Sequence, residues 1–100
     1  MSELRLSPEA EAELDGIWIY LARESGSIDI ATRVVESINE RIWLLARHPH
    51  VGRRRDDLGP GVRSITAGDY VVLHRIAEDD VVSILHVVHG GRDIDALFGD

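Results

Sequence analysis

The stretch from Val62 to His89 constrains the fold of this chain more than any other. Three runs rich in β-branched residues are separated by two polar clusters, Ala67-Gly68-Asp69 and Glu78-Asp79-Asp80. Short connections of this kind favour antiparallel neighbours. The stretch therefore predicts a three-stranded meander.

The last run of the meander, Val81 to His89, is apolar on both of its alternating sets of residues. This pattern is typical of a central strand that is buried on both faces of a sheet. Gly90-Gly91 ends the run, and Arg92 to Phe98 is predicted to form a tail with one helical turn. The two sets are expected on opposite faces, Val82, Ile84 and Val88 on one and Val81, Leu85 and Val87 on the other.

The first half of the chain predicts two helices. Ser7-Pro8 is a typical helix start, with Ser7 as the N-cap, and the helix is expected to end near Arg23. A second helix is predicted from Ser27 or Asp29 to His48, because Pro49 disfavours helical geometry before it. Each helix has an apolar stripe, made of Ala10, Leu14, Ile17, Trp18 and Leu21 in the first and of Ala31, Val34, Val35, Ile38, Ile42 and Leu45 in the second.

These elements predict one α+β domain over residues 1–100. A short strand at Leu4-Arg5-Leu6 precedes the helices, so the order is β-α-α-β-β-β. The few residues between the helices favour an antiparallel hairpin, which should pack on one face of a small, largely antiparallel sheet. Trp18 and Trp43 are expected to anchor the core. Residues 49–61 form an irregular segment, and loops of that length often carry function.

Composition excludes several classes of function. The chain has no cysteine, and the pairs His48/His50 and His86/His89 lack a suitably spaced third ligand. No glycine-rich phosphate loop is present, so we predict neither a metal nor a cofactor. No apolar run approaches a membrane span and the N-terminus lacks a signal-peptide profile, so a cytoplasmic protein without a membrane partner is expected.

Charge is distributed unevenly along the chain. The net charge is −7, yet residues 41–63 hold six arginines and two acids. An acidic protein is a poor general binder of nucleic acid. The run Arg53-Arg54-Arg55 has two interpretations. It is either a solvated loop balanced by Asp56 and Asp57, or a docking site for an acidic partner surface.

Several short motifs occur in an order that resembles a known family. They are Leu-Ser-Pro-Glu-Ala at residues 6–10, Leu45 to Pro49 followed by Gly52-Arg53, Gly61 to Ser64, Gly68 to Val72, Leu73-His74-Arg75, and Val87 to Asp93. Each motif is common, but their ordered combination resembles the RelE/ParE superfamily of toxins from type II toxin–antitoxin pairs. The resemblance is strongest to the ParE branch.

This resemblance implies a growth-arresting cytoplasmic toxin, of the kind associated with plasmid stabilisation. It implies neutralisation by a co-expressed, ParD-like antitoxin in a hetero-oligomer. An antitoxin could bind as an amphipathic helix in a groove or as an added edge strand. ParE-like members are associated with poisoning of DNA gyrase, whereas RelE-like members cleave messenger RNA in the ribosome. The fold supports both activities and does not choose between them.

Metal-free RNA cleavage requires acid–base groups and stabilisation of the charge that develops on the phosphate. A histidine–arginine constellation in and around the meander could supply both. The other interpretation is that these groups are solvated at the sheet edge or bind a partner. If the chain is a nuclease, the candidate catalytic residues are His74, His89, Arg63, Arg75 and Arg92.

Three departures from RelE-like nucleases argue against RNA cleavage. The chain has no lysine, it is acidic, and Phe98 stands where those nucleases commonly carry a catalytic tyrosine. We therefore expect a protein-binding toxin that inhibits DNA gyrase, with a ribosome-dependent endonuclease as the alternative. A member with degraded toxicity that serves only in the antitoxin complex is a third possibility. The candidate partner-binding residues are Arg53, Arg54, Arg55, Arg63, Arg92 and Phe98.

Overall fold

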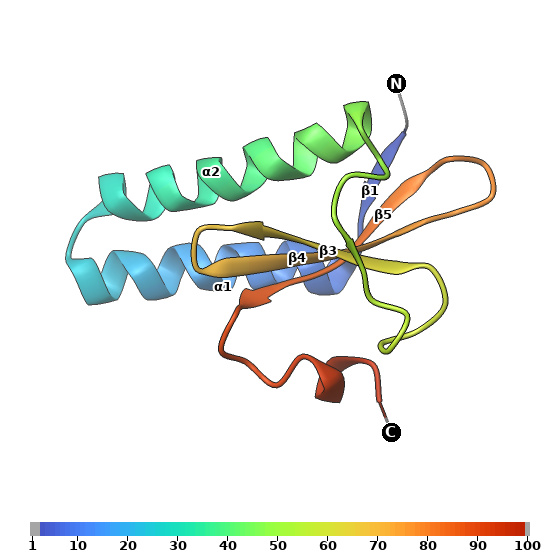
Figure 1. Ribbon diagram of the computed structural model, residues 1–100. Helices are drawn as coiled ribbons and strands as arrows, with labels where there is room; N and C mark the ends of the chain where they lie inside the picture. The colour runs from blue at the N-terminus through green and yellow to red at the C-terminus, as the bar shows by residue number, and fades with distance from the viewer. Residues whose placement is uncertain (1–2, 100) are drawn as a thin grey trace.

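The computed structural model describes residues 3–99 and confirms the predicted fold class. Two antiparallel helices lie against a five-stranded sheet (Figure 1). No helix in the described range is both long and apolar enough to cross a membrane. The elements are β1 (Leu4–Leu6), α1 (Pro8–Ser25), α2 (Ile28–Arg47), β2 (Arg53–Arg54), β3 (Val62–Ala67), β4 (Tyr70–Ile76), β5 (Val82–His89) and the 3₁₀ turn η1 (Asp95–Leu97).

Serine caps start both helices; the Ser7 cap was predicted, and Ser27 is one of the two predicted starting points of the second helix. The Ser7 hydroxyl accepts a hydrogen bond from Ala10 N at 3.0 Å, and the Ser27 hydroxyl accepts one from Ile30 N at 3.2 Å. Each bond satisfies a backbone N–H that has no partner within its helix. The first helix continues to Ser25, two residues beyond the prediction. It ends at Gly26, whose φ of 68° is a left-handed conformation that glycine adopts without strain.

The sheet contains the predicted meander at its centre. Strand order is β1-β5-β4-β3-β2, with β1 parallel to β5 and every other pair antiparallel. The two-residue strand β2 was not predicted. It lies within the irregular segment and pairs Arg53 with Ser64 and Arg54 with Arg63. The arginine run therefore starts on a sheet edge.

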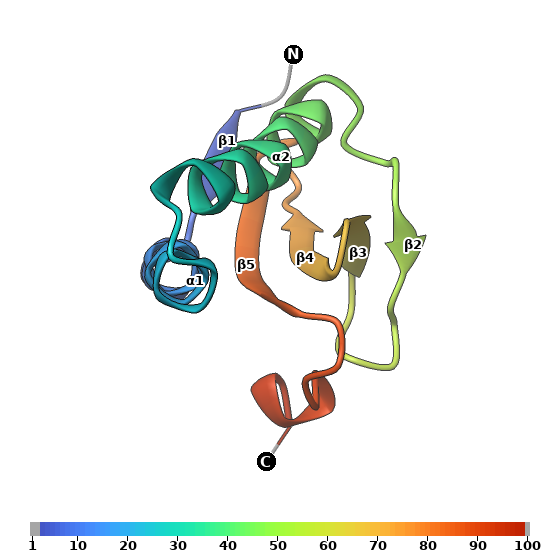
Figure 2. The same ribbon diagram turned by 90° about the vertical axis from the view of Figure 1, so that its left-hand side faces the viewer.

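The two faces of the sheet are covered by different parts of the chain (Figure 2). The helical hairpin covers one face, where its predicted apolar stripes meet the strands. The C-terminal segment covers the other face, where Ile94, Leu97 and Phe98 pack on a smaller cluster. That smaller cluster consists of Leu58, Val62, Leu73 and Val88.

A β-bulge in β5 makes the predicted division of its faces wrong. Leu73 pairs with His86, but the next residue, His74, pairs with Ile84, so Leu85 is an extra residue without a partner on β4. One extra residue reverses the direction of every side chain that follows it. Val87 therefore joins the helix-facing core with Val82 and Ile84, while Leu85 and Val88 lie with the opposite cluster.

The tryptophans do not anchor the core as predicted. Trp43 is 59% exposed, because it follows Ile42 by one position and so lies off the buried stripe of α2. Trp18 is half-buried, and its indole Nε1 donates a hydrogen bond to Thr32 Oγ1 at 3.1 Å. Trp18 therefore joins the two helices at their edge.

Candidate functional site

His74 is buried, contrary to the solvated sheet-edge position considered from the sequence. It lies on the helix-facing side of β4 opposite Ile84, and its exposed fraction is 0%. Neither ring nitrogen has a hydrogen-bond partner among the described residues. The pKa of His74 is lowered to about 4, mainly by burial; the backbone of Val72 raises it, and the positive charge of Arg63 lowers it by a smaller amount. The ring is therefore neutral at pH 7.

His89 lies far from His74. It ends β5 opposite Tyr70, and the two rings meet edge to face with centroids 5.6 Å apart. Tyr70 and His74 are four residues apart on β4, which corresponds to about 13 Å along an extended strand. His89 is exposed, and its Nδ1 accepts a hydrogen bond from Gly91 N at 3.1 Å. The two histidines therefore do not form one constellation.

The three candidate catalytic arginines lie in three different places. Arg63 Nη1 donates to the backbone oxygens of His50 and Gly52 at 3.1 and 3.3 Å. Arg75 Nε donates to Pro60 O at 3.2 Å. Arg92 is exposed and follows β5. Arg63 and Arg75 thus hold loops by their carbonyl groups, and only Arg92 lies beside His89.

Local ion pairs balance two arginines of the Arg53-Arg54-Arg55 run. Arg54 pairs with Asp56 at 2.9 Å, and Arg55 binds Asp57 through two bonds of 3.1 and 3.0 Å. The hydrogen bond from Arg55 lowers the pKa of the Asp57 carboxyl. Within residues 3–99, Arg53 has no carboxylate partner. The predicted local balance therefore holds for Arg54 and Arg55 but not for Arg53.

Arg53 faces a basic surface groove along β3. The groove has a volume of about 580 Å³ and is lined in part by Arg41, Arg53 and Arg55 together with Ile65 and Val71. Arg41 Nε donates to Thr66 O at 3.0 Å. That bond occupies a backbone acceptor on β3 beyond the end of β2.

Phe98 packs within the molecule. Its ring meets the His86 ring edge to face, with centroids 5.5 Å apart, and it is half-buried against the second apolar cluster. The side chain that replaces the expected tyrosine therefore helps to cover the sheet. Its predicted contact with a partner would use only the part of the ring that remains exposed.

Glu13 has a role that the sequence did not reveal. Its carboxylate accepts hydrogen bonds from Val87 N at 3.0 Å and from His86 Nδ1 at 3.0 Å. No spacing rule links residues 73 positions apart, and the bulge that directs them toward Glu13 has no clear sequence signal.

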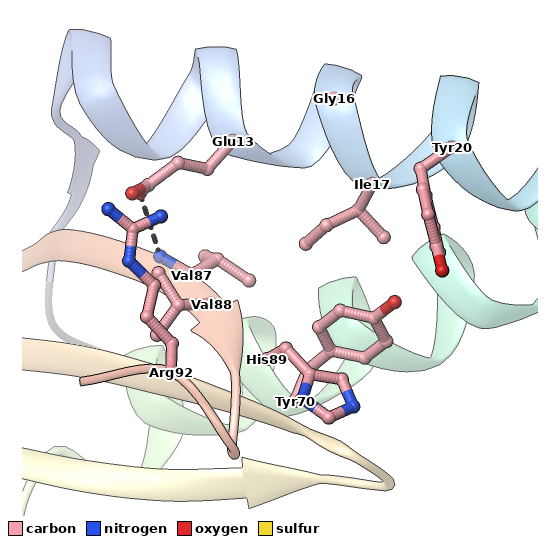
Figure 3. Close-up of a pocket in the computed structure, with 9 residues that line it drawn as sticks. All are labelled: Glu13, Gly16, Ile17, Tyr20, Tyr70, Val87, Val88, His89 and Arg92. Carbon is pink, nitrogen blue, oxygen red and sulfur yellow. Dashed lines mark hydrogen bonds between the residues drawn. The ribbon is translucent and has the colours of Figure 1, made fainter. Parts of the chain in front are cut away.

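A groove of about 470 Å³ lies between α1 and the ends of β4 and β5 (Figure 3). Its α1 wall consists of Glu13, Gly16, Ile17 and Tyr20, and Tyr70, Val87, Val88, His89 and Arg92 line the rest. In Figure 3 the Arg92 guanidinium and the Glu13 carboxylate point toward the same end of the groove. Phenol, imidazole and guanidinium groups beside apolar walls can bind a polypeptide surface.

The Tyr70 phenol is a hydrogen-bond donor in the groove. Burial raises the pKa of the Tyr70 phenol, so it stays protonated near neutral pH. In residues 3–99, no three His, Asp or Glu side chains gather closely enough to hold a metal ion.

Comparison with known proteins identifies the family. The family model for the ParE toxin of the type II toxin–antitoxin system parDE matches residues 4–94. The chain is 31% identical over 99 residues to Toxin ParE1 of Caulobacter vibrioides, covering 99% of this chain and 100% of that one. It is 30% identical over 94 residues to Toxin ParE1 of Mycobacterium tuberculosis, covering 94% and 95%.

Solved structures agree with the sequence comparison. A chain of the chromosomal ParDE system from P. aeruginosa is similar with a TM-score of 0.76 and 25% identity, over 89% of this chain and 96% of that one. A chain of the RelBE2 toxin–antitoxin complex of Mycobacterium tuberculosis is similar with a TM-score of 0.65 and 26% identity, over 88% and 96%. The fold and the sequence together show that this chain belongs to the ParE toxin family and is a ParE-like toxin of a type II toxin–antitoxin system.

Proposed function

We propose that this toxin arrests growth in the cytoplasm by binding DNA gyrase, without chemistry of its own. One observation carries the proposal: the residues that an RNA-cleaving site would need are dispersed. His74 is buried and neutral, while Arg63 and Arg75 are engaged with loop carbonyls. Only His89 and Arg92 share a surface, and His89 already accepts a backbone hydrogen bond.

Two further features support a protein target. The net charge of −7 opposes approach to the polyanionic ribosome, because long-range repulsion lowers the association rate. Phe98 lacks a hydroxyl and packs against the sheet. The grooves beside Arg53 and Arg92 provide concave, partly apolar surfaces of the kind that protein partners use.

We further propose that a co-expressed, ParD-like antitoxin neutralises the toxin by covering these surfaces. The two structural neighbours come from toxin–antitoxin systems, which supports a partner of that type. Arg53 is a candidate first contact for an acidic antitoxin segment, because it forms no ion pair with a carboxylate in residues 3–99. Co-expression with the neighbouring small reading frame should yield a complex that copurifies at a fixed stoichiometry.

A supercoiling assay with purified gyrase tests the proposed target. We expect the toxin to reduce conversion of relaxed plasmid to supercoiled plasmid, and the antitoxin to restore it. Full supercoiling at molar excess of toxin would remove gyrase as the target.

The ribosome-dependent nuclease remains the second candidate, because one structural neighbour belongs to a RelBE complex. Mapping of new messenger RNA ends on translating ribosomes tests it. Intact transcripts in cells that the toxin has arrested would exclude it. Normal growth during expression without antitoxin would instead indicate a member that has lost its toxicity.

A further inference from the structure

His74 is a buried polar side chain that the proposed function does not use. Its ring has no exposed surface, and both of its nitrogens lack a hydrogen-bond partner in the described chain. An unpaired polar group in a protein interior is costly, so such an arrangement persists only where the surrounding structure imposes it.

Residues 49–52, here called the strap, separate His74 from solvent. The strap connects α2 to β2, and His50, Val51 and Gly52 are exposed on its outer side. Gly52 lies directly against the ring. A Cβ on Gly52 would lie 3.3 Å from His74 Cε1 and 2.8 Å from Ser64 O. Only a glycine, here with a φ of 110°, allows the backbone to approach this closely.

Arg63 holds the strap in place. Its guanidinium donates to the carbonyl oxygens of His50 and Gly52, at the two ends of the short turn that covers the ring. Arg63 is also the direct neighbour of His74 across the β3–β4 ladder. The same cation that closes the strap therefore lies beside the histidine.

No negative group in the described chain compensates a charge on His74. Arg63 approaches from β3, and its charge opposes protonation of the ring. Opposite His74 on β5 is the apolar Ile84, and the strap supplies Gly52. On β4 itself the adjacent Arg75 alternates to the other face of the sheet, where it bonds Pro60. A protonated ring could be solvated only if its cover moved.

We propose that His74 and the strap form an acid-sensitive latch, in which protonation of His74 opens the strap and frees β2 from the edge of β3. The strap is the part of the cover that can move most easily, because it is exposed and is held by two hydrogen bonds from one side chain. Gly52 is followed directly by Arg53, so an open strap also displaces the start of the arginine run.

Nuclear magnetic resonance titration of the whole toxin tests the latch. The His74 ring should titrate at about 4, well below the ordinary value of 6.5 for histidine. The amide signals of Gly52 and Arg53 should change with the same midpoint. The amides of Ala10 and Val72, in the core, should stay unchanged over that range. Simultaneous loss of strap and core signals would mean global unfolding and would overturn the proposal.

Three variants sharpen the titration. His74→Leu should abolish the pH response of the strap, whereas His50→Ala, which removes an exposed histidine of the strap itself, should leave it intact. Gly52→Ala should hold the strap open at neutral pH and raise the His74 midpoint by roughly one to two pH units, because water then reaches the ring. This variant decides the matter if His74→Leu fails to fold.

Two results would contradict the latch. One is a strap that still responds to pH in His74→Leu. The other is a His74 midpoint that Gly52→Ala leaves unchanged. The titration needs neither gyrase nor antitoxin, so its failure would leave the proposed function standing.

Discussion

Glu13 on α1 and His86 on β5 are 73 residues apart in sequence, and Glu13 Oε2 lies 3.0 Å from His86 Nδ1. The other carboxylate oxygen accepts the Val87 N–H at 3.0 Å. β1 pairs with β5 only as far as Ile84, so Val87 lies beyond the end of β1 and the Glu13 carboxylate serves as the acceptor there. The His86 ring in turn contacts Phe98 of the tail. One carboxylate therefore links the helical hairpin, the sheet and the segment that covers the opposite face.

Replacing Glu13 with alanine should destabilise the toxin by about 2–3 kcal/mol, because a half-buried N–H and the His86 ring each lose a charged acceptor. Urea denaturation followed by circular dichroism measures the loss. Glu11→Ala is the matched control, since Glu11 is an exposed glutamate two residues earlier on the same helix. It should change stability by less than about 0.5 kcal/mol. Equal effects of the two substitutions would show that Glu13 contributes only its charge.

Stability should fall as the pH is lowered from 7 to 4. The pKa of His74 is about 4 in the folded state against an ordinary value of 6.5, so the unfolded chain takes up the proton first. The neutral ring thus contributes stability above pH 6.5, and that contribution is lost as the pH falls through this window. The expected loss between pH 7 and pH 5 is about 2 kcal/mol.

Urea denaturation at several pH values checks this dependence. His74→Leu should remove most of the change, and His50→Ala should retain it. A wild-type curve that is flat between pH 7 and pH 5 would contradict the burial of an unprotonated His74.

Two glycines should respond to alanine in opposite directions. Gly16 lies within α1, and no neighbouring atom is within 4 Å of the position that a Cβ would take, so Gly16→Ala should stabilise the toxin by about 0.5–1 kcal/mol through helix propensity. Gly26 ends the same helix with a φ of 68°, so Gly26→Ala should destabilise it by about 1 kcal/mol. Thermal unfolding of both variants measures the difference. A destabilising Gly16→Ala would mean that the helix is strained at that position.

Charge reversal at Arg53 should weaken antitoxin binding by roughly tenfold, and the loss should shrink at high salt. Arg53 forms no ion pair with a carboxylate in the described chain, so a carboxylate of an acidic partner segment can pair with it without displacing another. Arg5→Glu is the control, because Arg5 is exposed on β1 at the opposite edge of the sheet. Calorimetric titration with the antitoxin compares the two variants. Equal losses would indicate a general charge effect without a local contact.

The elements that local chemistry specifies could be predicted from the sequence. The Ser7 cap, the proline after α2 and the polar turns of the meander each act within a few residues, and all lie where expected. The apolar periodicity of the helices likewise identified the buried stripes. The fold class followed from the lengths of the connections.

Features that depend on contacts between distant segments could not be predicted. The bulge at Leu85 reverses the direction of the side chains that follow it in β5. Because the run is apolar at nearly every position, its pattern does not indicate which residues face the helices. The strand β2 has only two residues and forms because β3 offers an edge. Trp43 was expected inside on the average behaviour of tryptophan, and its position beside the stripe overrode that average.

The candidate site shows the same division. Arg53, Arg92 and His89 are exposed and line grooves, and the role of Arg53 and Arg92 in binding a partner stays a prediction. Tertiary packing buries His74 under the strap. It also brings the guanidinium groups of Arg63 and Arg75 to the loop carbonyls that they bind. A sequence names the groups that could act but does not say which of them reach a common surface.

The proposed mode of action is binding of gyrase without catalysis. It is tested most directly by one gyrase supercoiling assay, titrated in parallel with the wild-type toxin and with the variant Arg75→Ala. Arg75 belongs to the candidate nuclease set and lines neither of the two grooves proposed for protein partners. We expect both proteins to block supercoiling at concentrations within about twofold of each other, since the variant shifts binding free energy by less than about 0.5 kcal/mol. Undiminished supercoiling in the presence of excess wild-type toxin would contradict the claim.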